Sequence, residues 1–182
     1  MGRPLAFDRQ TAIGEARRVF FEKGYEGASI EDLTAALGIS RASLYNTFGD
    51  KRGLLLEAVE AACAEGETMR GKAIERRCRT KMIVRDFFRS LSGPETDGCF
   101  LLTLGAELAD SDEEVKRRVG ESLDKTRRMF VELLQREGPA PHVEKKAAQL
   151  VGVMVALLTL ARVHPDRKML EAIAEQGTAI LD

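Results

Sequence analysis

The sequence predicts an all-α protein of about nine helices, in which a head of three short N-terminal helices sits on a larger helical body. Strand-like alternation of apolar and polar residues is nearly absent, and Ala, Leu, Glu, Lys and Arg dominate segments with helical spacing. Of the 182 residues, 44% are apolar, which is enough to fill a core. We expect the head at residues 1–52 and the body at residues 53–182.

Overall charge and apolar runs exclude several classes of protein. The chain has 28 basic and 29 acidic residues, so its net charge requires neither a nucleic acid nor a membrane as partner. The longest apolar run, Leu150 to Ala161, is shorter than the roughly 20 residues that cross a bilayer. The first apolar-rich stretch lacks the core of a signal peptide. These features predict a cytoplasmic protein without a membrane span.

The cysteines and histidines give no pattern of a metal site. Cys63, Cys78 and Cys99 are odd in number and widely scattered, without zinc spacing or the even count of a disulfide framework. His142 and His164 share no metal-ligand spacing. We expect free thiols, no metal and no cofactor.

Capping residues and apolar periodicity locate the first two helices. The first is predicted from about Asp8 to Lys23, and Gly24 ends it. Its apolar face consists of Ala12, Ala16, Val19 and Phe20. The second helix starts after Ser29, a serine N-cap followed three residues later by Asp32. Its apolar stripe consists of Ile30, Leu33 and Leu37.

A glycine separates the second helix from the third. Gly38 can close the second helix in the left-handed conformation, and Ser40 can cap the third. The apolar side chains of the third helix are Leu44 and Phe48. Gly49 ends it, and Asp50 caps a fourth helix that begins at Lys51. The head is therefore predicted as three short helices joined by tight turns.

The body helices are predicted to be longer. The fourth helix extends to about Ile74 despite Gly66 and Gly71. Ser111 and Glu114 stand at capping-box spacing and open another long helix, which ends at Gly138. "SGPETDG" is a loop by composition. The other predicted helices run from about Lys81 to Leu91, Cys99 to Ala109, His142 to Val163 and Pro165 to Leu181.

Two short helices around a glycine turn are typical of a helix-turn-helix unit, whose second helix enters the DNA major groove, but also of an ordinary helical hairpin. With Leu44 and Phe48 pointing inward, the other faces of the third helix are compact and rich in hydrogen-bonding groups. They carry Arg41, Ala42, Ser43, Tyr45, Asn46 and Thr47. Arginine can pair with a guanine edge, alanine can contact a thymine methyl, and serine can bond a base or a phosphate.

This segment resembles the DNA-binding head of the TetR (tetracycline repressor) family. The matching residues are Leu33, Gly38, Ile39, Ser40, Ser43, Leu44, Tyr45, Phe48 and Lys51, and the wider match covers about residues 7–58. Two positions depart from the family pattern: Thr34 replaces the usual alanine, and Thr47 stands where histidine or tyrosine commonly contacts a phosphate. The resemblance implies base contacts by Arg41, Ala42, Ser43 and Tyr45 and phosphate contacts by Ser29, Tyr45, Thr47 and Lys51.

The resemblance also implies the function and the partners. A member of this family would be a transcriptional regulator, here expected to be a repressor that a small hydrophobic effector releases from a palindromic DNA operator. The family forms homodimers mainly through its last two long helices. In this chain "AAQLVGVMVALLTLA" is apolar nearly all round, which indicates burial on more than one side. Candidate dimer residues are Leu150, Met154, Leu157 and Leu158.

Thioether and aromatic side chains of the body could line an effector pocket, or could simply fill the core. These candidates are Met82, Phe87, Phe88, Phe100, Leu104, Met129, Phe130 and Met154, and no charged ligand anchor is evident among them. Cys99 is expected at a helix N-terminus, where the helix dipole would lower the pKa of its thiol.

Two alternative functions remain at this stage. A regulator with the same head could sense oxidants or electrophiles through Cys99, although a small buried residue there would have no such role. An all-helical enzyme or small-molecule carrier could use the hairpin only structurally. We find no catalytic triad, no paired carboxylates in an apolar setting, no phosphate loop and no zinc spacing, so we expect no enzyme.

Overall fold

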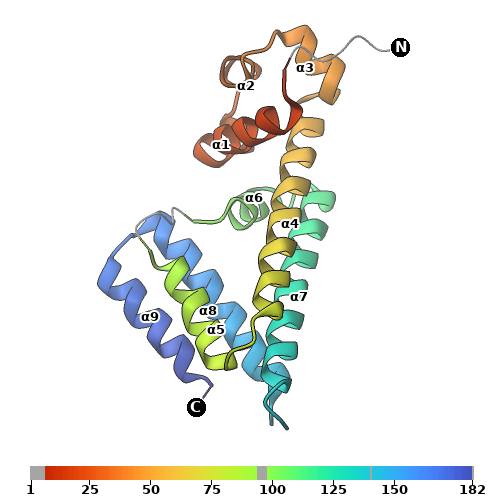
Figure 1. Ribbon diagram of the computed structural model, residues 1–182. Helices are drawn as coiled ribbons and strands as arrows, with labels where there is room; N and C mark the ends of the chain where they lie inside the picture. Colours follow the sequence, from red (N-terminus) through yellow and green to blue (C-terminus); the bar gives the residue numbers. More distant parts are fainter. Residues whose placement is uncertain (1–6, 94–97, 140, 182) are drawn as a thin grey trace.

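The computed structural model describes residues 7–93, 98–139 and 141–181. Within these residues the chain forms nine helices and no strands, which confirms the predicted all-α class (Figure 1). They are α1 (Arg9–Gly27), α2 (Ile30–Leu37), α3 (Arg41–Phe48), α4 (Lys51–Glu75), α5 (Thr80–Leu91), α6 (Phe100–Leu108), α7 (Glu113–Gln135), α8 (Val143–Val163) and α9 (Arg167–Ala179). The middle of the predicted "SGPETDG" loop lies outside the described residues.

The head and the body are joined by one long helix. Figure 1 shows α1, α2 and α3 grouped at one end, with α4 running from them down the body beside α7. α5, α8 and α9 pack together at the other end, and α6 lies between the two groups. Because α4 starts at Lys51 and continues through Gly66 and Gly71, it crosses the expected boundary between residues 52 and 53 without a break.

Local capping explains why the head helices begin and end where they do. The Ser29 hydroxyl accepts the Asp32 N–H, and the Asp32 carboxylate accepts the Ser29 N–H, each at 3.0 Å, which is a complete capping box. Gly38 ends α2 in the predicted left-handed conformation, with φ 65°. The Ser40 hydroxyl accepts the Ser43 N–H at 3.1 Å and caps α3.

The corner between α3 and α4 requires a glycine. Asp50 caps α4 by accepting the Gly53 N–H at 2.7 Å, which brings the start of α4 close to the end of α3. A Cβ atom on residue 53 would overlap the carbonyl oxygen of Phe48. Glycine at this position therefore allows the recognition-type helix α3 to pack directly against the helix that leads into the body.

Two boundaries differ from the sequence prediction. α1 extends beyond the predicted end, but Gly24 breaks its helical geometry with φ 74° and ψ 171°. The cap of α7 was predicted wrongly: Asp112, and not Ser111, accepts the N–H groups of Glu114 and Val115, at 3.0 and 3.1 Å. The Asp112 carboxylate also receives the Arg52 guanidinium at 2.7 Å, an interaction that a serine could not replace.

Apolar side chains form two clusters. The first joins the head to the part of the body nearest it, through residues of α1–α4, α6 and the first half of α7. It includes the fully buried Phe20, Leu33 and Leu44. The second lies among α5, α7, α8 and α9 around Phe88 and Phe130, whose ring centroids are 6.3 Å apart. Cys99 and Leu123 pack against both clusters.

α8 is longer than the apolar run recognised in the sequence. An 18-residue stretch of this 21-residue helix has a mean hydropathy of 1.6, so by length and composition alone α8 could cross a bilayer. Its buried side chains instead pack in the second cluster, as in a core helix. They are Ala147, Leu150, Met154, Leu157, Leu158 and Ala161. The four residues predicted for a dimer seam thus lie inside the single chain, and a different face of α8 is exposed.

Candidate DNA interface and effector cavity

The exposed face of α3 carries the residues predicted to contact bases. Leu44 and Phe48 are buried beneath it, while Arg41 and Ala42 are exposed and Ser43 is half-buried. Tyr45 is 43% exposed, a large fraction for an aromatic residue in the middle of a helix. The anchoring residues and the predicted base-contacting residues therefore lie on opposite sides of one short, capped helix.

Two of these side chains have partners within the head. The Arg41 guanidinium donates to the Glu31 carboxylate of α2 at 2.6 Å, and both side chains are largely exposed. The hydroxyls of Ser40 and Ser43 are 2.9 Å apart, within hydrogen-bond distance. An exposed ion pair of this kind contributes little to stability, so a guanine edge could replace Glu31 as the partner of Arg41 at small cost.

The predicted phosphate-contacting residues lie at helix starts or on α3. Ser29 is exposed at the N-terminus of α2, and Lys51 stands at that of α4, where backbone N–H groups favour an anion. The Lys51 ammonium lies 4.5 Å from the centroid of the Tyr25 ring, and Thr47 is half-buried. Their contacts with DNA, like those of the base-side residues, stay predictions.

A lysine keeps the α2 cap charged. Lys23 donates to the Asp32 carboxylate at 2.6 Å, and the Ser29 backbone N–H donates to the same group. Chiefly because of Lys23, the pKa of Asp32 falls to about 2. The Asp32 carboxylate in the capping box at the N-terminus of α2 is therefore ionised throughout the physiological pH range.

Besides ion pairs of α1 with α4, three polar contacts attach the head to α6, α7 and α8. The Glu107 carboxylate of α6 accepts the backbone N–H groups of Tyr25 and Glu26, each at 3.0 Å. The Arg162 guanidinium at the end of α8 donates to the Phe21 carbonyl at 2.5 Å and lies 4.0 Å from the centroid of the Phe21 ring. The third contact is the ion pair of Arg52 with the α7 cap. The position of α1 therefore depends directly on α6 and α8.

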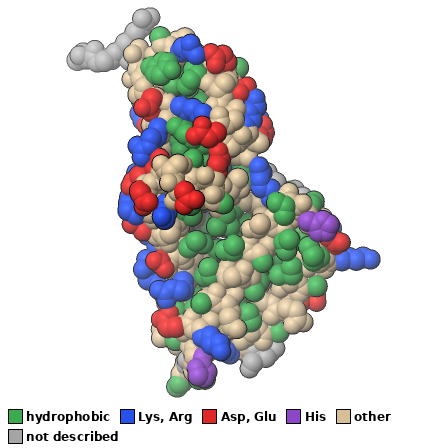
Figure 2. All heavy atoms as spheres, turned by 180° about the vertical axis from the view of Figure 1, so that it is seen from behind, with side chains coloured by type: hydrophobic (Ala, Val, Ile, Leu, Met, Phe, Trp, Pro, Cys, Tyr) green, Lys and Arg blue, Asp and Glu red, His purple; other side chains and the backbone are tan. Residues whose placement is uncertain are grey.

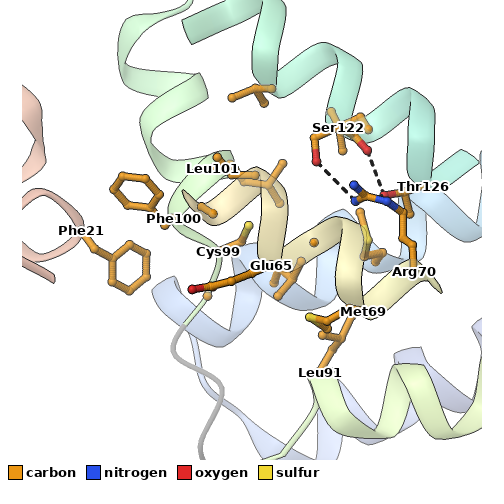
Figure 3. Close-up of a pocket in the computed structure, with 18 of the residues that line it drawn as sticks. Phe21, Glu65, Met69, Arg70, Leu91, Cys99, Phe100, Leu101, Ser122 and Thr126 are labelled. Atoms are coloured by element: carbon orange, nitrogen blue, oxygen red, sulfur yellow. Dashed lines mark hydrogen bonds between the residues drawn. The ribbon is translucent and has the colours of Figure 1, made fainter. Parts of the chain in front are cut away.

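A cavity of about 580 Å³ lies between the head and the body. Its walls come from α1, α4, α5, α6, α7 and α8, so they include residues of both apolar clusters. Figure 3 shows Phe21 and Phe100 on one side and Arg70 on the other, with Met69 and Leu91 along the edge nearest α5. The volume falls in the range of binding sites for small organic molecules.

The predicted pocket residues divide into two groups. Phe87, Phe100, Met129 and Met154 line the cavity. Phe88, Leu104 and Phe130 are fully buried in the two clusters, and Met82 is 42% exposed on the surface of α5. Helical spacing identified all eight as apolar, but it does not distinguish a side chain that faces a cavity from one that faces a neighbouring helix.

Sequence reasoning missed Arg70, a half-buried cation in the cavity wall. Arg70 projects from α4 toward α7, where its guanidinium approaches the hydroxyls of Ser122 and Thr126 (Figure 3). The one signal in the sequence was Gly66, four residues earlier on the same face of α4, which leaves space for the long side chain.

The predicted low pKa of Cys99 was wrong. Burial raises the pKa of the Cys99 thiol above its ordinary value, although the backbone N–H groups of Leu102 and Leu101 act in the opposite direction. Cys99 does precede α6 as its N-cap and does line the cavity. Burial therefore outweighs the helix N-terminus, and the thiol is protonated at neutral pH. Within the described residues, no group of three or more His, Cys, Asp or Glu side chains could hold a metal ion.

Comparison with known families assigns both parts of the chain. Residues 12–58 match the bacterial regulatory proteins of the tetR family, and residues 78–176 match the tetracyclin repressor-like C-terminal domain. The chain belongs to the TetR family of transcriptional regulators. The predicted family is thereby confirmed, and this TetR-family protein is a DNA-binding transcriptional regulator and not an enzyme.

Two bacterial regulators are similar to this chain, one of them over its whole length. The HTH-type transcriptional regulator YezE of Bacillus subtilis is 29% identical over 194 residues, covering all of both chains. The transcriptional repressor ComR of Escherichia coli is 29% identical over 135 residues, covering 64% of this chain and 60% of ComR.

A solved relative contains DNA. A cysteine-substituted form of the TetR-family regulator CifR, in complex with 26-base-pair operator DNA, is 28% identical to this chain and has a TM-score of 0.86. The superposition covers 97% of this chain and 98% of the CifR chain. This chain therefore has the fold of a relative that binds double-stranded DNA.

Proposed function

We propose that this TetR-family protein is a cytoplasmic, homodimeric repressor that a small molecule releases from a palindromic operator. The observation that carries the proposal is the position of the cavity: Gly14, Arg17 and Phe21 of the head helix α1 form part of its wall, together with body helices. A molecule that fills the cavity contacts the head directly. It can therefore favour one orientation of the head over another if it binds that orientation more tightly.

An exposed stripe of α8 supports the dimer. Small or apolar residues recur on this face at helical spacing, and Figure 2 shows hydrophobic side chains gathered over the face of the body that contains it. The stripe consists of the exposed Ala148, Gly152, Thr159 and Val163 and the half-buried Val155. Small residues allow two helices to approach closely. A second copy of the chain that covers this face would explain why α8 is apolar beyond its buried side. We name these five residues the α8 stripe.

A two-fold dimer would present two copies of α3 to the DNA. Recognition helices related by two-fold symmetry read half-sites one helical turn apart or a multiple of it, so the operator is palindromic. In the head, residues 1–52 hold eight basic and seven acidic groups, so binding relies on the placement of charges more than on a strong positive field.

Selection of binding sites tests the proposal. Full-length protein is incubated with random double-stranded DNA at low salt, and the bound fraction is sequenced over several rounds. We expect a palindrome with two half-sites. Repeating the binding measurement with a library of small molecules should then identify compounds that release the protein. Enrichment of no sequence at low salt would overturn the DNA-binding part, and a non-palindromic single site would overturn the two-fold arrangement.

A thiol-based sensor is a second candidate, because Cys99 lines the cavity and is not in a disulfide. Its raised pKa makes it a slow nucleophile, so only a strong electrophile or oxidant concentrated in the cavity would react. Replacing Cys99 by serine tests this candidate, with Cys63→Ser as control. If oxidants or electrophiles release the wild type and Cys63→Ser from the operator but not Cys99→Ser, the thiol is the sensor. Equal release of all three proteins would rule it out.

A further inference from the structure

Arg70 holds a positive charge inside the cavity that no carboxylate of the described residues contacts. Its Nη1 donates to the Ser122 hydroxyl at 3.5 Å and the Thr126 hydroxyl at 3.4 Å, both near the upper limit for a hydrogen bond. Its Nη2 is buried and has no hydrogen-bond partner. Buried guanidinium groups are normally paired, because a charge left unpaired in a dry environment is costly. The unpaired Nη2–H groups therefore require an explanation.

The surroundings of Arg70 hold the guanidinium at the cavity wall. A Cβ atom on Gly66 would lie 3.0 Å from Nη1, so the absence of a side chain there makes room for the guanidinium over α4. Thr126 is buried and its hydroxyl donates to the Ser122 carbonyl at 3.0 Å, which turns the oxygen lone pairs of Thr126 toward Arg70. Residues of two helices thus position one end of the guanidinium and leave the other end, Nη2, without a hydrogen-bond partner.

Neighbouring carboxylates are already engaged elsewhere. Glu65 is the one acidic residue among those that line the cavity, and it pairs with Arg17 at 2.5 Å. Glu67, three residues before Arg70 on α4, forms an ion pair with Lys125. Burial lowers the pKa of the Arg70 guanidinium below its ordinary value, yet an arginine stays charged at neutral pH. Within the described residues, the cavity wall therefore holds a guanidinium that has no ion-pair partner at contact distance.

We propose that Arg70 binds the anionic group of the effector, which is a small amphipathic anion such as a carboxylate on an apolar body. This inference rests on the proposed role of the cavity as the effector site. A carboxylate or sulfonate at Arg70 would accept hydrogen bonds from the guanidinium and could also accept one from the Ser122 hydroxyl. The apolar part of the same molecule would extend toward Phe21 and Phe100 on the opposite side (Figure 3). The sequence predicted a small hydrophobic effector, and this inference adds an anionic group to it.

Two fluorescent probes that differ in one charged group test the inference. Anilinonaphthalene sulfonate is anionic, and N-phenylnaphthylamine has the same ring system without the sulfonate. Titrations of the full-length protein should show preference for the anionic probe, and decanoate should displace it at lower concentration than decanol. In Arg70→Met, binding of the anionic probe should weaken by about tenfold or more, while binding of the neutral probe changes little.

Three further variants separate a binding role from a structural one. Lys72→Met removes an exposed cation from the same helix and should leave both probes unaffected. Arg70→Lys keeps the charge and should retain part of the preference. Because Arg70→Met removes a half-buried charge that has no ion-pair partner, the midpoint of thermal unfolding should not fall, whereas loss of a structural arginine would lower it. Arg70→Gln serves as a second neutral variant in the probe titrations.

The outcomes distinguish this inference from the proposed function. If both probes bind the wild type equally and Arg70→Met changes neither, the cavity remains an effector site but the anion inference is wrong. If neither probe binds, or if Gly14→Trp leaves probe binding unchanged, both the inference and the cavity as effector site are overturned. Gly14 suits this purpose because it lines the cavity and a Cβ atom there would meet nothing within 4 Å.

Discussion

Replacing Arg41 by alanine is expected to weaken binding to the operator by roughly 30-fold or more and binding to random DNA by only a few-fold. A bidentate contact from arginine to guanine contributes about 1–3 kcal/mol to discrimination between bases, and a dimer makes the contact twice. Arg41 is exposed and is held only by the exposed Glu31, so no buried interaction is lost in the free protein. Fluorescence anisotropy with labelled operator and scrambled duplexes at one fixed salt concentration measures both affinities.

The control for this experiment is Arg128→Ala, which removes an exposed arginine from the body helix α7. It should leave both affinities within about twofold of the wild type. Equal losses on operator and scrambled DNA for Arg41→Ala would mean that Arg41 contacts a phosphate, and the base-reading role would be abandoned. In that case the magnitude of the slope of the logarithm of the binding constant against the logarithm of the salt concentration should fall by about one per copy of the residue.

Replacing Gly152 by arginine is expected to convert the dimer to a monomer and to reduce operator binding by at least about 100-fold. The exposed α8 stripe would have to bury two unpaired guanidinium groups, which is far more costly than any contact they could form there. The separate chain should tolerate the change, since a Cβ atom at position 152 meets nothing within 4 Å and arginine is a better helix former than glycine. Light scattering coupled to size-exclusion chromatography measures the mass in solution.

A matched glycine elsewhere provides the control. Gly120 of α7 is also exposed, and a Cβ atom added there would likewise meet nothing within 4 Å, but it lies on the solvent face of a different helix. Gly120→Arg should remain dimeric and bind the operator like the wild type. A dimeric Gly152→Arg protein with normal operator affinity would place the interface away from the α8 stripe.

The helices of the head could be predicted from sequence because each boundary is decided by neighbours in the chain. Ser29, Gly38 and Ser40 act through hydrogen bonds or backbone angles within three or four residues. The start of α7 was harder, because Ser111 and Asp112 can both act as caps. Asp112 prevails where Arg52, 60 residues earlier, approaches its carboxylate. That approach depends on the packing of α4 against α7.

The cavity could be predicted only in outline, because tertiary packing decides which side chains line it and which are buried against other helices. Phe87 and Phe88 are neighbours in sequence, yet Phe87 lines the cavity and Phe88 is fully buried beside Phe130. Arg70 resembles any surface arginine of a long helix until α7 covers it. For Cys99 the helix N-terminus was visible in the sequence, but the burial that outweighs it was not.

The position of the cavity between the two apolar clusters links the stability of the protein to its choice of effector. Cys99 and Leu123 contact both clusters, so the protein without effector has an incomplete core at the place where its two halves meet. A bound effector would fill this gap and act as an additional core residue, with binding energy appearing as resistance to unfolding. Substitutions that enlarge the cavity would then lower the stability of the chain while admitting larger effectors. Substitutions that make the cavity smaller would stabilise the chain and restrict the effectors that fit. Evolution of a new effector specificity in this protein is therefore constrained by folding as well as by recognition.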